Sequence, residues 1–178
     1  MAEELVKLTA SEAAAAIARG AISAEDYTRA CLERIEARDG EIKAFAHLDR
    51  DHALAQARKL DERRLEGHPL GPLHGIPVAI KDIIDTADYP TELGSPLAAG
   101  RRTRNDATVV AKLRAAGAVI IGKTVTTEFA YYHPGPTRNP HDHARTPGGS
   151  SSGSAGSWPA ITSRISARSS SERANAPM

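Results

Sequence analysis

Three stretches of the sequence carry residues that could do chemistry: GIPVAIKDIID (75–85), GAVIIGKT (117–124) and GGSSSGSA (148–155). In the first, Lys81 stands among apolar residues, so its amine lies either in water at a strand end or inside the protein. Burial disfavours the charged form of a lysine and lowers its pKa, which makes a neutral amine available as a base. Lys81 is therefore a candidate for proton transfer, and a solvated lysine at a strand end is the alternative.

The stretch GAVIIGKT, Gly117 to Thr124, matches the phosphate-binding pattern G-x-x-x-x-G-K-[ST]. A true phosphate-binding loop follows a strand and keeps a flexible cradle between its glycines. Here an expected helix precedes Gly117, and the intervening AVII is itself typical of a strand. We therefore interpret Gly117 as the residue that ends the helix, and nucleotide binding is kept only as an alternative.

The elements that must position these residues indicate an α/β domain. Helices are expected at 9–20, 23–40, 50–67, 105–117 and 123–132, and strands at 42–48, 75–85 and 118–122. Thr9 and Ser23 are followed three residues later by acidic residues, as at helix N-termini. GIPVAIKDIID is a continuous apolar run, the pattern of a strand buried on both faces. The order strand, helix, strand favours a parallel sheet, with the N-terminal helices packed outside it.

Glycine and serine alternation such as GGSSSGSA is, taken alone, typical of a flexible linker. A linker explains neither the GPTRNPHDHARTP that precedes it nor the lysine in the apolar run. The blocks GPLHGIPVAIKDIIDT, AGAVIIGKTVTTEFA and GPTRNPHDHARTPGGSSSGSA resemble, in this order, the amidase signature family. The resemblance runs from Gly71 to Ala155 and implies that family's fold, a mixed or parallel sheet flanked by helices, here truncated after the glycine-serine cluster.

The resemblance also implies a function, the hydrolysis of amide carbon–nitrogen bonds through an acyl-enzyme. Family members use a serine nucleophile, a second serine preceded by a cis peptide bond, and a lysine base. Lys81 corresponds to the lysine, and Ser150 corresponds to the cis serine. Lys81 would then take the proton of Ser150, which takes that of the nucleophile.

The nucleophile itself is expected in a TGGS-like stretch downstream, and the position expected for it holds Ala174. We therefore expect residues 1–155 to be the N-terminal part of an amidase signature domain. Residues 156–178 would be a tail outside the family, and their scattered arginines predict disorder. Such a chain lacks the nucleophile and most of the oxyanion site, so we expect it to be inactive alone. A non-catalytic relic or binding module is the alternative.

Composition narrows the class of protein further. The chain has 178 residues, enough for one domain, and its net charge of +1 predicts neither a nucleic-acid partner nor a membrane partner. The single cysteine, Cys31, is expected to be a small core residue, and the acidic N-terminus predicts a reducing cytoplasm. We expect no cofactor and no metal ion, and the resemblance implies a small-molecule amide as the substrate of the full-length family.

Overall fold

The fold is a small mixed sheet between layers of helices, and the computed structural model describes residues 2–161. The helices are α1 (Ala2–Leu5), α2 (Ala10–Ala18), α3 (Ala24–Ile42), α4 (Arg50–Leu65), α5 (Thr108–Ala115) and α6 (Ser152–Ile161), with short 3-10 helices η1 (Pro96–Ala98) and η2 (Glu128–Ala130). The strands are β1 (Phe45–Leu48), β2 (Pro77–Lys81) and β3 (Val119–Thr124).

The N-terminal helices begin at the expected caps, but one ends later than expected. The Thr9 side chain and Glu12 form a reciprocal capping box at α2, and the Ser23 side chain accepts from the backbone N–H of Asp26 at α3. Gly40 does not end α3, as its sequence position suggested, because the helix continues to Ile42 and stops where Lys43 adopts a left-handed conformation.

The sheet has the strand order β1-β3-β2. β2 and β3 are parallel neighbours, with Lys81 opposite Thr124, and β1 pairs antiparallel with β3. The prediction that GIPVAI and AVIIG lie in one sheet is therefore confirmed, and the added antiparallel strand makes the sheet mixed. Because β2 and β3 are parallel and the α5 crossover joins them, their carboxyl ends meet at the same edge of the sheet.

β2 is shorter and more exposed than its apolar sequence predicted. It spans Pro77–Lys81, and only Ile80 within it is buried, so the expectation of a strand buried on both faces is wrong for this segment. The reason is its place in the sheet, since β2 is an edge strand and β3 occupies the centre. Every residue of β3 is buried.

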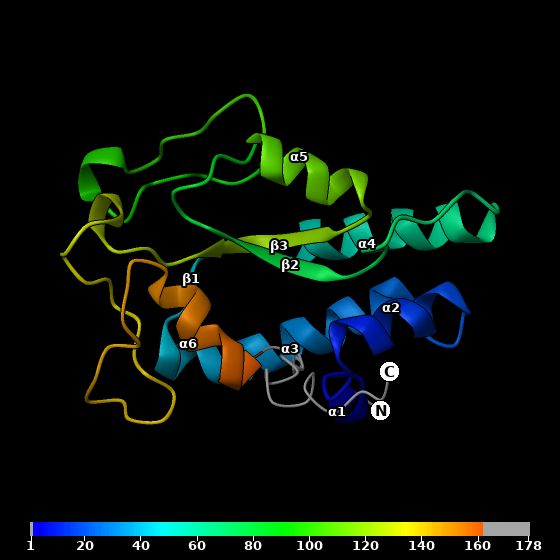
Figure 1. Ribbon diagram of the computed structural model, residues 1–178, viewed down its shortest axis with the longest axis horizontal. Coiled ribbons are helices and arrows are strands. Elements are labelled where there is room, and N and C mark those ends of the chain that lie inside the picture. The colour runs from blue at the N-terminus through cyan, green and yellow to red at the C-terminus, as the bar shows by residue number, and fades with distance from the viewer. Residues whose placement is uncertain (1, 162–178) are drawn as a thin grey trace, which may run out of the picture.

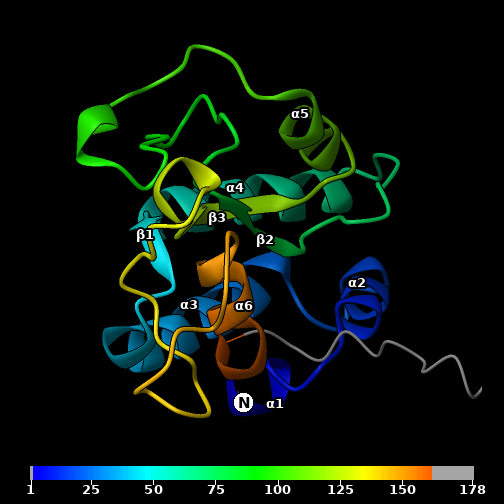
Figure 2. The same ribbon diagram turned by 60° about the vertical axis from the view of Figure 1, so that its left-hand side comes forward.

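Helices cover both faces of the sheet. Figure 1 shows α2, α3 and α6 on one side and α5 on the other, and Figure 2 shows the same layers after rotation. Alternate residues of β3 serve the two cores: Val119 and Ile121 pack with the N-terminal helices, whereas Ile120 packs with Val110 of α5. Cys31 packs against the first of these cores, and burial raises the pKa of its thiol to about 12.

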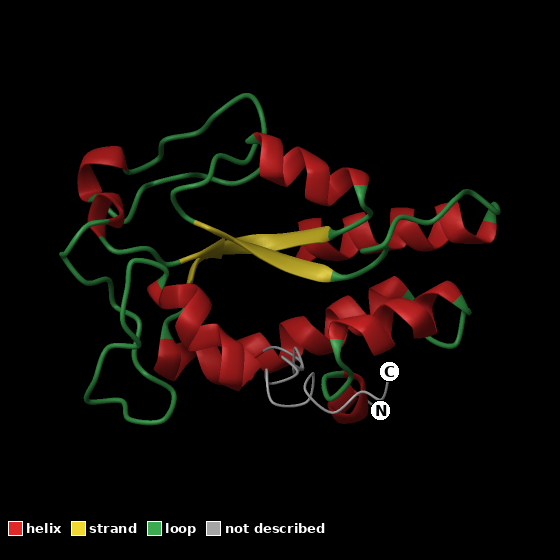
Figure 3. Cartoon of the chain, in the orientation of Figure 1, coloured by secondary structure: helices red, strands yellow, loops and turns green. Residues whose placement is uncertain are grey.

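The long connections that follow β2 and β3 gather at one end of the sheet, as Figure 3 shows in green. The expected helix at 123–132 is largely absent, because β3 continues to Thr124 and only Glu128–Ala130 forms a 3-10 turn. The chain then returns through the glycine-serine cluster into α6, which contacts α3, β2 and β3. Ligand sites of α/β sheets lie at this carboxyl edge.

The C-terminal segment begins as helix. α6 continues through Ile161, so the disorder predicted for residues 156–178 is wrong for 156–161, which are helical. The rest of that tail lies outside the described residues. Within 2–161 no helix is both long enough and apolar enough to cross a membrane.

Gly122 provides a test of the central position of β3. A Cβ at this residue would overlap the carbonyl oxygen of His47 on β1, so Gly122→Ala should push the two strands apart. We expect overpacking of this kind to lower the free energy of unfolding by about 1 to 3 kcal/mol, measured by chemical denaturation.

The matched control is Gly40→Ala, because Gly40 lies inside α3 with nothing within 4 Å of the added methyl group. That substitution should raise the free energy of unfolding by about 0.5 to 1 kcal/mol. Equal effects of the two substitutions would contradict the tight pairing of β1 and β3.

Candidate functional site

The structure brings together the two residues that the sequence singled out for chemistry. The Lys81 Nζ donates a hydrogen bond to the Ser150 Oγ at 2.7 Å, although the residues are 69 positions apart in the chain. The peptide bond between Gly149 and Ser150 is cis, which is the conformation that the family resemblance implied for this serine. The lysine and the serine therefore form one polar pair at the carboxyl edge of the sheet.

Lys81 is the last residue of β2, so the strand places its side chain at the carboxyl edge of the sheet. Its backbone lies opposite Thr124 of β3, and its side chain is half-buried. Burial lowers the pKa of the Lys81 amine from its ordinary value. The neutral form of the amine, which can accept a proton, therefore becomes populated at a lower pH than in a solvated lysine.

Hydrogen bonds from the segment that follows β3 hold the backbone of Ser150 in place. Its carbonyl oxygen accepts from the Thr127 N–H at 3.0 Å and from the Thr126 Oγ1 at 3.2 Å. Three residues later the Gly153 N–H donates to the Val125 carbonyl at 2.9 Å. A Cβ at Gly153 would overlap the Val125 backbone nitrogen, so glycine permits this close approach.

A second lysine, Lys123, to which the sequence analysis gave no role, lies in β3 next to Thr124, the residue opposite Lys81. Lys123 is fully buried, and its Nζ lies 3.3 Å from the Asp82 Oδ1, whose side chain is 2% exposed. Lys123 is the lysine of the GAVIIGKT stretch, and Asp82 is the residue that follows Lys81. The phosphate-loop alternative therefore fails, because this lysine is inside β3 and Gly117 follows the end of α5 with a φ of 89°.

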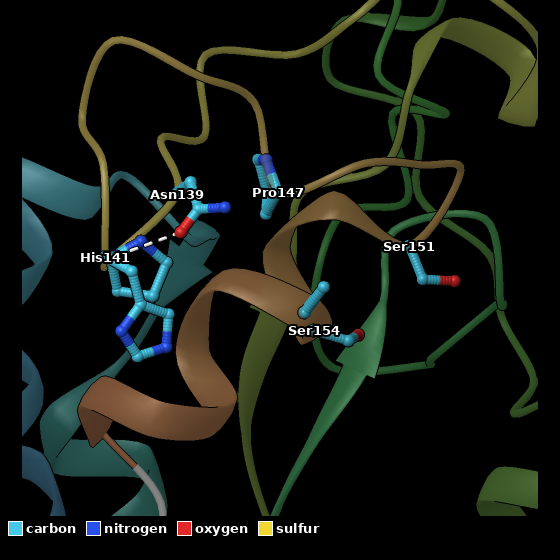
Figure 4. Close-up of a pocket in the computed structure, with 7 residues that line it drawn as sticks. Asn139, His141, Pro147, Ser151 and Ser154 are labelled. Carbon is cyan, nitrogen blue, oxygen red and sulfur yellow. Dashed lines mark hydrogen bonds between the residues drawn. The ribbon is translucent and has the colours of Figure 1, made fainter.

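A cavity of about 610 Å³ lies next to the glycine-serine cluster. Figure 4 shows residues of the 139–147 loop on one side and the beginning of α6 on the other. The lining residues are Asn139, Pro140, His141, Pro147, Ser151, Ser154 and Ala155. Lys81 and Ser150 are not among them, so the hydrogen-bonded pair and not the cavity defines the candidate site. Within 2–161 no group of His, Cys, Asp and Glu side chains is arranged to hold a metal ion.

Ser157 and the serines that follow it are the serine hydroxyl groups that the chain offers after the glycine-serine cluster, and only Ser157 lies within the described residues. Ser157 lies in α6, where its hydroxyl donates to the Ser154 carbonyl at 3.1 Å. The remaining candidates lie outside the described residues, as does Ala174; they are Ser163, Ser166, Ser169, Ser170 and Ser171. Within residues 2–161, Lys81 is the hydrogen-bond partner of the Ser150 Oγ, and no hydroxyl group bonds to that oxygen.

The comparison with protein families matches the amidase family model over residues 26–165. The chain belongs to the amidase family. The match covers the sheet, the Lys81 and Ser150 pair and α6, and it extends ten residues beyond Ala155.

Curated relatives and solved structures agree with this assignment. The chain is 47% identical over 169 residues to a glutamyl-tRNA(Gln) amidotransferase subunit of Salinispora arenicola, covering 92% of this chain and 34% of the relative. It is 52% identical over 157 residues to the corresponding subunit of Thermobifida fusca, covering 85% and 32%. Among structures, the peptide amidase of Stenotrophomonas maltophilia is 37% identical with a TM-score of 0.79, covering 85% of this chain and 34% of that chain.

A bacterial aryl acylamidase of the amidase signature family has the same fold, with a TM-score of 0.82 and 26% identity over 89% of this chain and 35% of that chain. The amidase-signature fold expected from the sequence is therefore confirmed. The chain spans about a third of the length of the curated relatives it matches.

The lowered pKa of Lys81 predicts a measurable reactivity. Only the neutral amine reacts with trinitrobenzenesulfonate, so the pH midpoint for modification of Lys81 should be lower in the folded chain than in the same chain unfolded in urea. Mass spectrometry of the Lys81 peptide across a pH series measures both midpoints. Coincident midpoints would show that the fold does not desolvate this amine.

Proposed function

We propose that this chain supplies the base and the proton relay of a Ser/cis-Ser/Lys amidase that hydrolyses small-molecule amides. The observation that carries the proposal is the 2.7 Å hydrogen bond between the Lys81 Nζ and the Ser150 Oγ. The amidase family match and the cis bond before Ser150 support it. Lys81 acts as the base and Ser150 as the relay.

The proton moves in two steps through this pair. The nucleophile's hydroxyl gives its proton to the Ser150 Oγ as its oxygen attacks the amide carbon, and Ser150 gives its own proton to the neutral Lys81 amine. The lysine then holds a proton that can be returned through the same path to the leaving nitrogen. Desolvation of Lys81 favours the neutral starting form, which this direction of transfer requires.

We further propose that the nucleophile is not supplied by this chain, and that the chain alone does not hydrolyse amides. Residues 1–155 are the N-terminal part of the amidase signature domain in this proposal, and 156–178 lie outside it, although the family match itself extends to residue 165. The sequence after Gly156 has no further glycine, and Ser157, which follows Gly156, lies within the helix α6, so no TGGS-like turn is expected there. Without such a turn there are no paired backbone donors for an oxyanion, which are worth about 10² to 10³ in rate.

A second candidate is a role as part of an amidotransferase. The two relatives named as subunits of glutamyl-tRNA(Gln) amidotransferase are 47% and 52% identical to this chain. An amidotransferase component would require other polypeptides for its reaction, whereas a stand-alone amidase would not. We propose for either protein the cytoplasmic location that was expected from the sequence.

A chimera tests the proposed function. Residues 1–155 of this chain replace the aligned N-terminal third of the Thermobifida fusca protein, which retains its own remainder. We expect this chimera to hydrolyse a simple aryl amide and the 178-residue chain to show no activity. Substituting Lys81→Ala or Ser150→Ala in the chimera should each lower kcat by about 10² to 10⁴, the range for loss of general acid–base catalysis.

The control is Lys112→Ala, which changes an exposed lysine on α5 and should leave the rate unchanged. A folded chimera without activity would favour the non-catalytic relic. Amide hydrolysis by the 178-residue chain with an acyl-enzyme burst would instead show that a nucleophile lies within it. The nucleotide sequence after the codon for Ala155 adds an independent test, since a reading frame broken near that codon would leave an amidase continuation in another frame.

A further inference from the structure

The buried ion pair of Lys123 and Asp82 has no part in the proposed proton path, yet its residues adjoin Lys81 in the sequence and in the sheet. Lys123 is 0% exposed and Asp82 is 1% exposed. Each neighbours a residue at the end of its strand, since Asp82 follows Lys81 and Lys123 precedes Thr124, which is the residue opposite Lys81 in the sheet. Two buried charges are thus placed one residue away from the proposed base.

The three donors of the Lys123 ammonium are matched by three acceptors. The Nζ lies 2.6 Å from the Thr91 Oγ1, 3.1 Å from the Pro90 carbonyl oxygen and 3.3 Å from the Asp82 Oδ1. Burial lowers the pKa of the Lys123 amine, and Asp82 opposes that shift. The ammonium therefore connects the centre of the sheet to the segment around residue 91.

Asp82 also connects the sheet to the segment around residue 91, through both its carboxylate and its backbone. Its carboxylate accepts from the Glu92 N–H at 3.2 Å, its N–H donates to the Thr124 carbonyl at 2.9 Å, and its carbonyl accepts from the Leu93 N–H at 3.0 Å. The backbone directly after Lys81 is thereby tied both to β3 and to the returning chain. β2 is an edge strand, so its end is held by the neighbouring strand β3 and by the hydrogen bonds of Lys123 and Asp82, which we call the clamp.

Stability alone is a weak reason for such a pair. Desolvation of two buried charges offsets much of their attraction, and apolar residues of similar size often stabilise a protein as well or better. Directional bonds from one ammonium to three defined oxygens do something that apolar packing does not, because they fix the direction in which the chain leaves β2.

We propose that Lys123 and Asp82 are positioning residues, which hold the end of β2 so that the Lys81 amine meets Ser150. The inference rests on the proposed function in that it takes Lys81 to be the base. The backbone of Ser150 is hydrogen-bonded to Thr126 and Thr127, directly after the strand that carries Lys123. The same stretch of chain therefore positions both Lys81 and Ser150. The nearby Asp85 and Arg101 bind each other at 2.7 Å and remain in place in the variants below.

The test uses the 178-residue chain and the pH midpoint for modification of Lys81. The double variant Asp82→Asn/Lys123→Met removes both charges, so neither is left buried without a partner. We expect it to unfold cooperatively, while the Lys81 midpoint rises toward the value measured in urea. A merely structural pair would change the unfolding midpoint but not the Lys81 pH profile.

A matched control removes the same two charges from the surface. Asp51→Asn/Lys112→Met changes two exposed residues on α4 and α5 and should leave the Lys81 midpoint unchanged. Thr91→Val keeps the ion pair and removes the shortest bond of Lys123, so a smaller rise is expected. If the double variant does not fold, Thr91→Val decides the question. An unchanged Lys81 midpoint in the folded variants overturns the proposal.

The outcome is separable from that of the chimera. A rise in the Lys81 midpoint together with an inactive chimera would support the positioning role and reject the amidase function. An active chimera together with an unchanged Lys81 midpoint would support the amidase function and reject the positioning role.

Discussion

The site depends on one stretch of backbone, the end of β3 and the residues that directly follow it. Lys123 clamps the end of β2, Thr124 lies opposite Lys81, and Val125 to Thr127 hold the loop that carries Ser150. This stretch is buried throughout, so water does not compete for its backbone groups. The same stretch of backbone therefore positions both Lys81 and Ser150, although the two residues are far apart in sequence.

This arrangement explains why the glycine-serine cluster is not a linker. Gly153 approaches the Val125 backbone so closely that a side chain would not fit, and Gly148 adopts a φ of 88°. The cluster thus turns the chain from an exposed loop into α6 while it presents Ser150 to Lys81. Its small residues serve close backbone contact, and its hydrogen bonds to the segment after β3 order a composition that in isolation would be flexible.

The sequence allowed the sheet, most helix starts and the Lys81 and Ser150 pair to be predicted, because caps, buried apolar runs and family blocks are local signals. It did not predict the clamp. Lys123 fell within a pattern that suggested phosphate binding, and only its position inside β3 shows that it faces Asp82. Strand order was also hidden, so β2 was taken for a strand buried on both faces, although it lies at an edge.

The central claim is that the fold itself places the amine of Lys81 against the hydroxyl of Ser150. The nuclear Overhauser effect between the Lys81 Hε and the Ser150 Hβ protons measures this contact in solution, with Lys81→Arg to assign the lysine signals. The account predicts a clear cross-peak, since the Nζ and Oγ atoms are 2.7 Å apart. Absence of the cross-peak in the folded chain would show that the two residues are not held together, and it would contradict the proton relay.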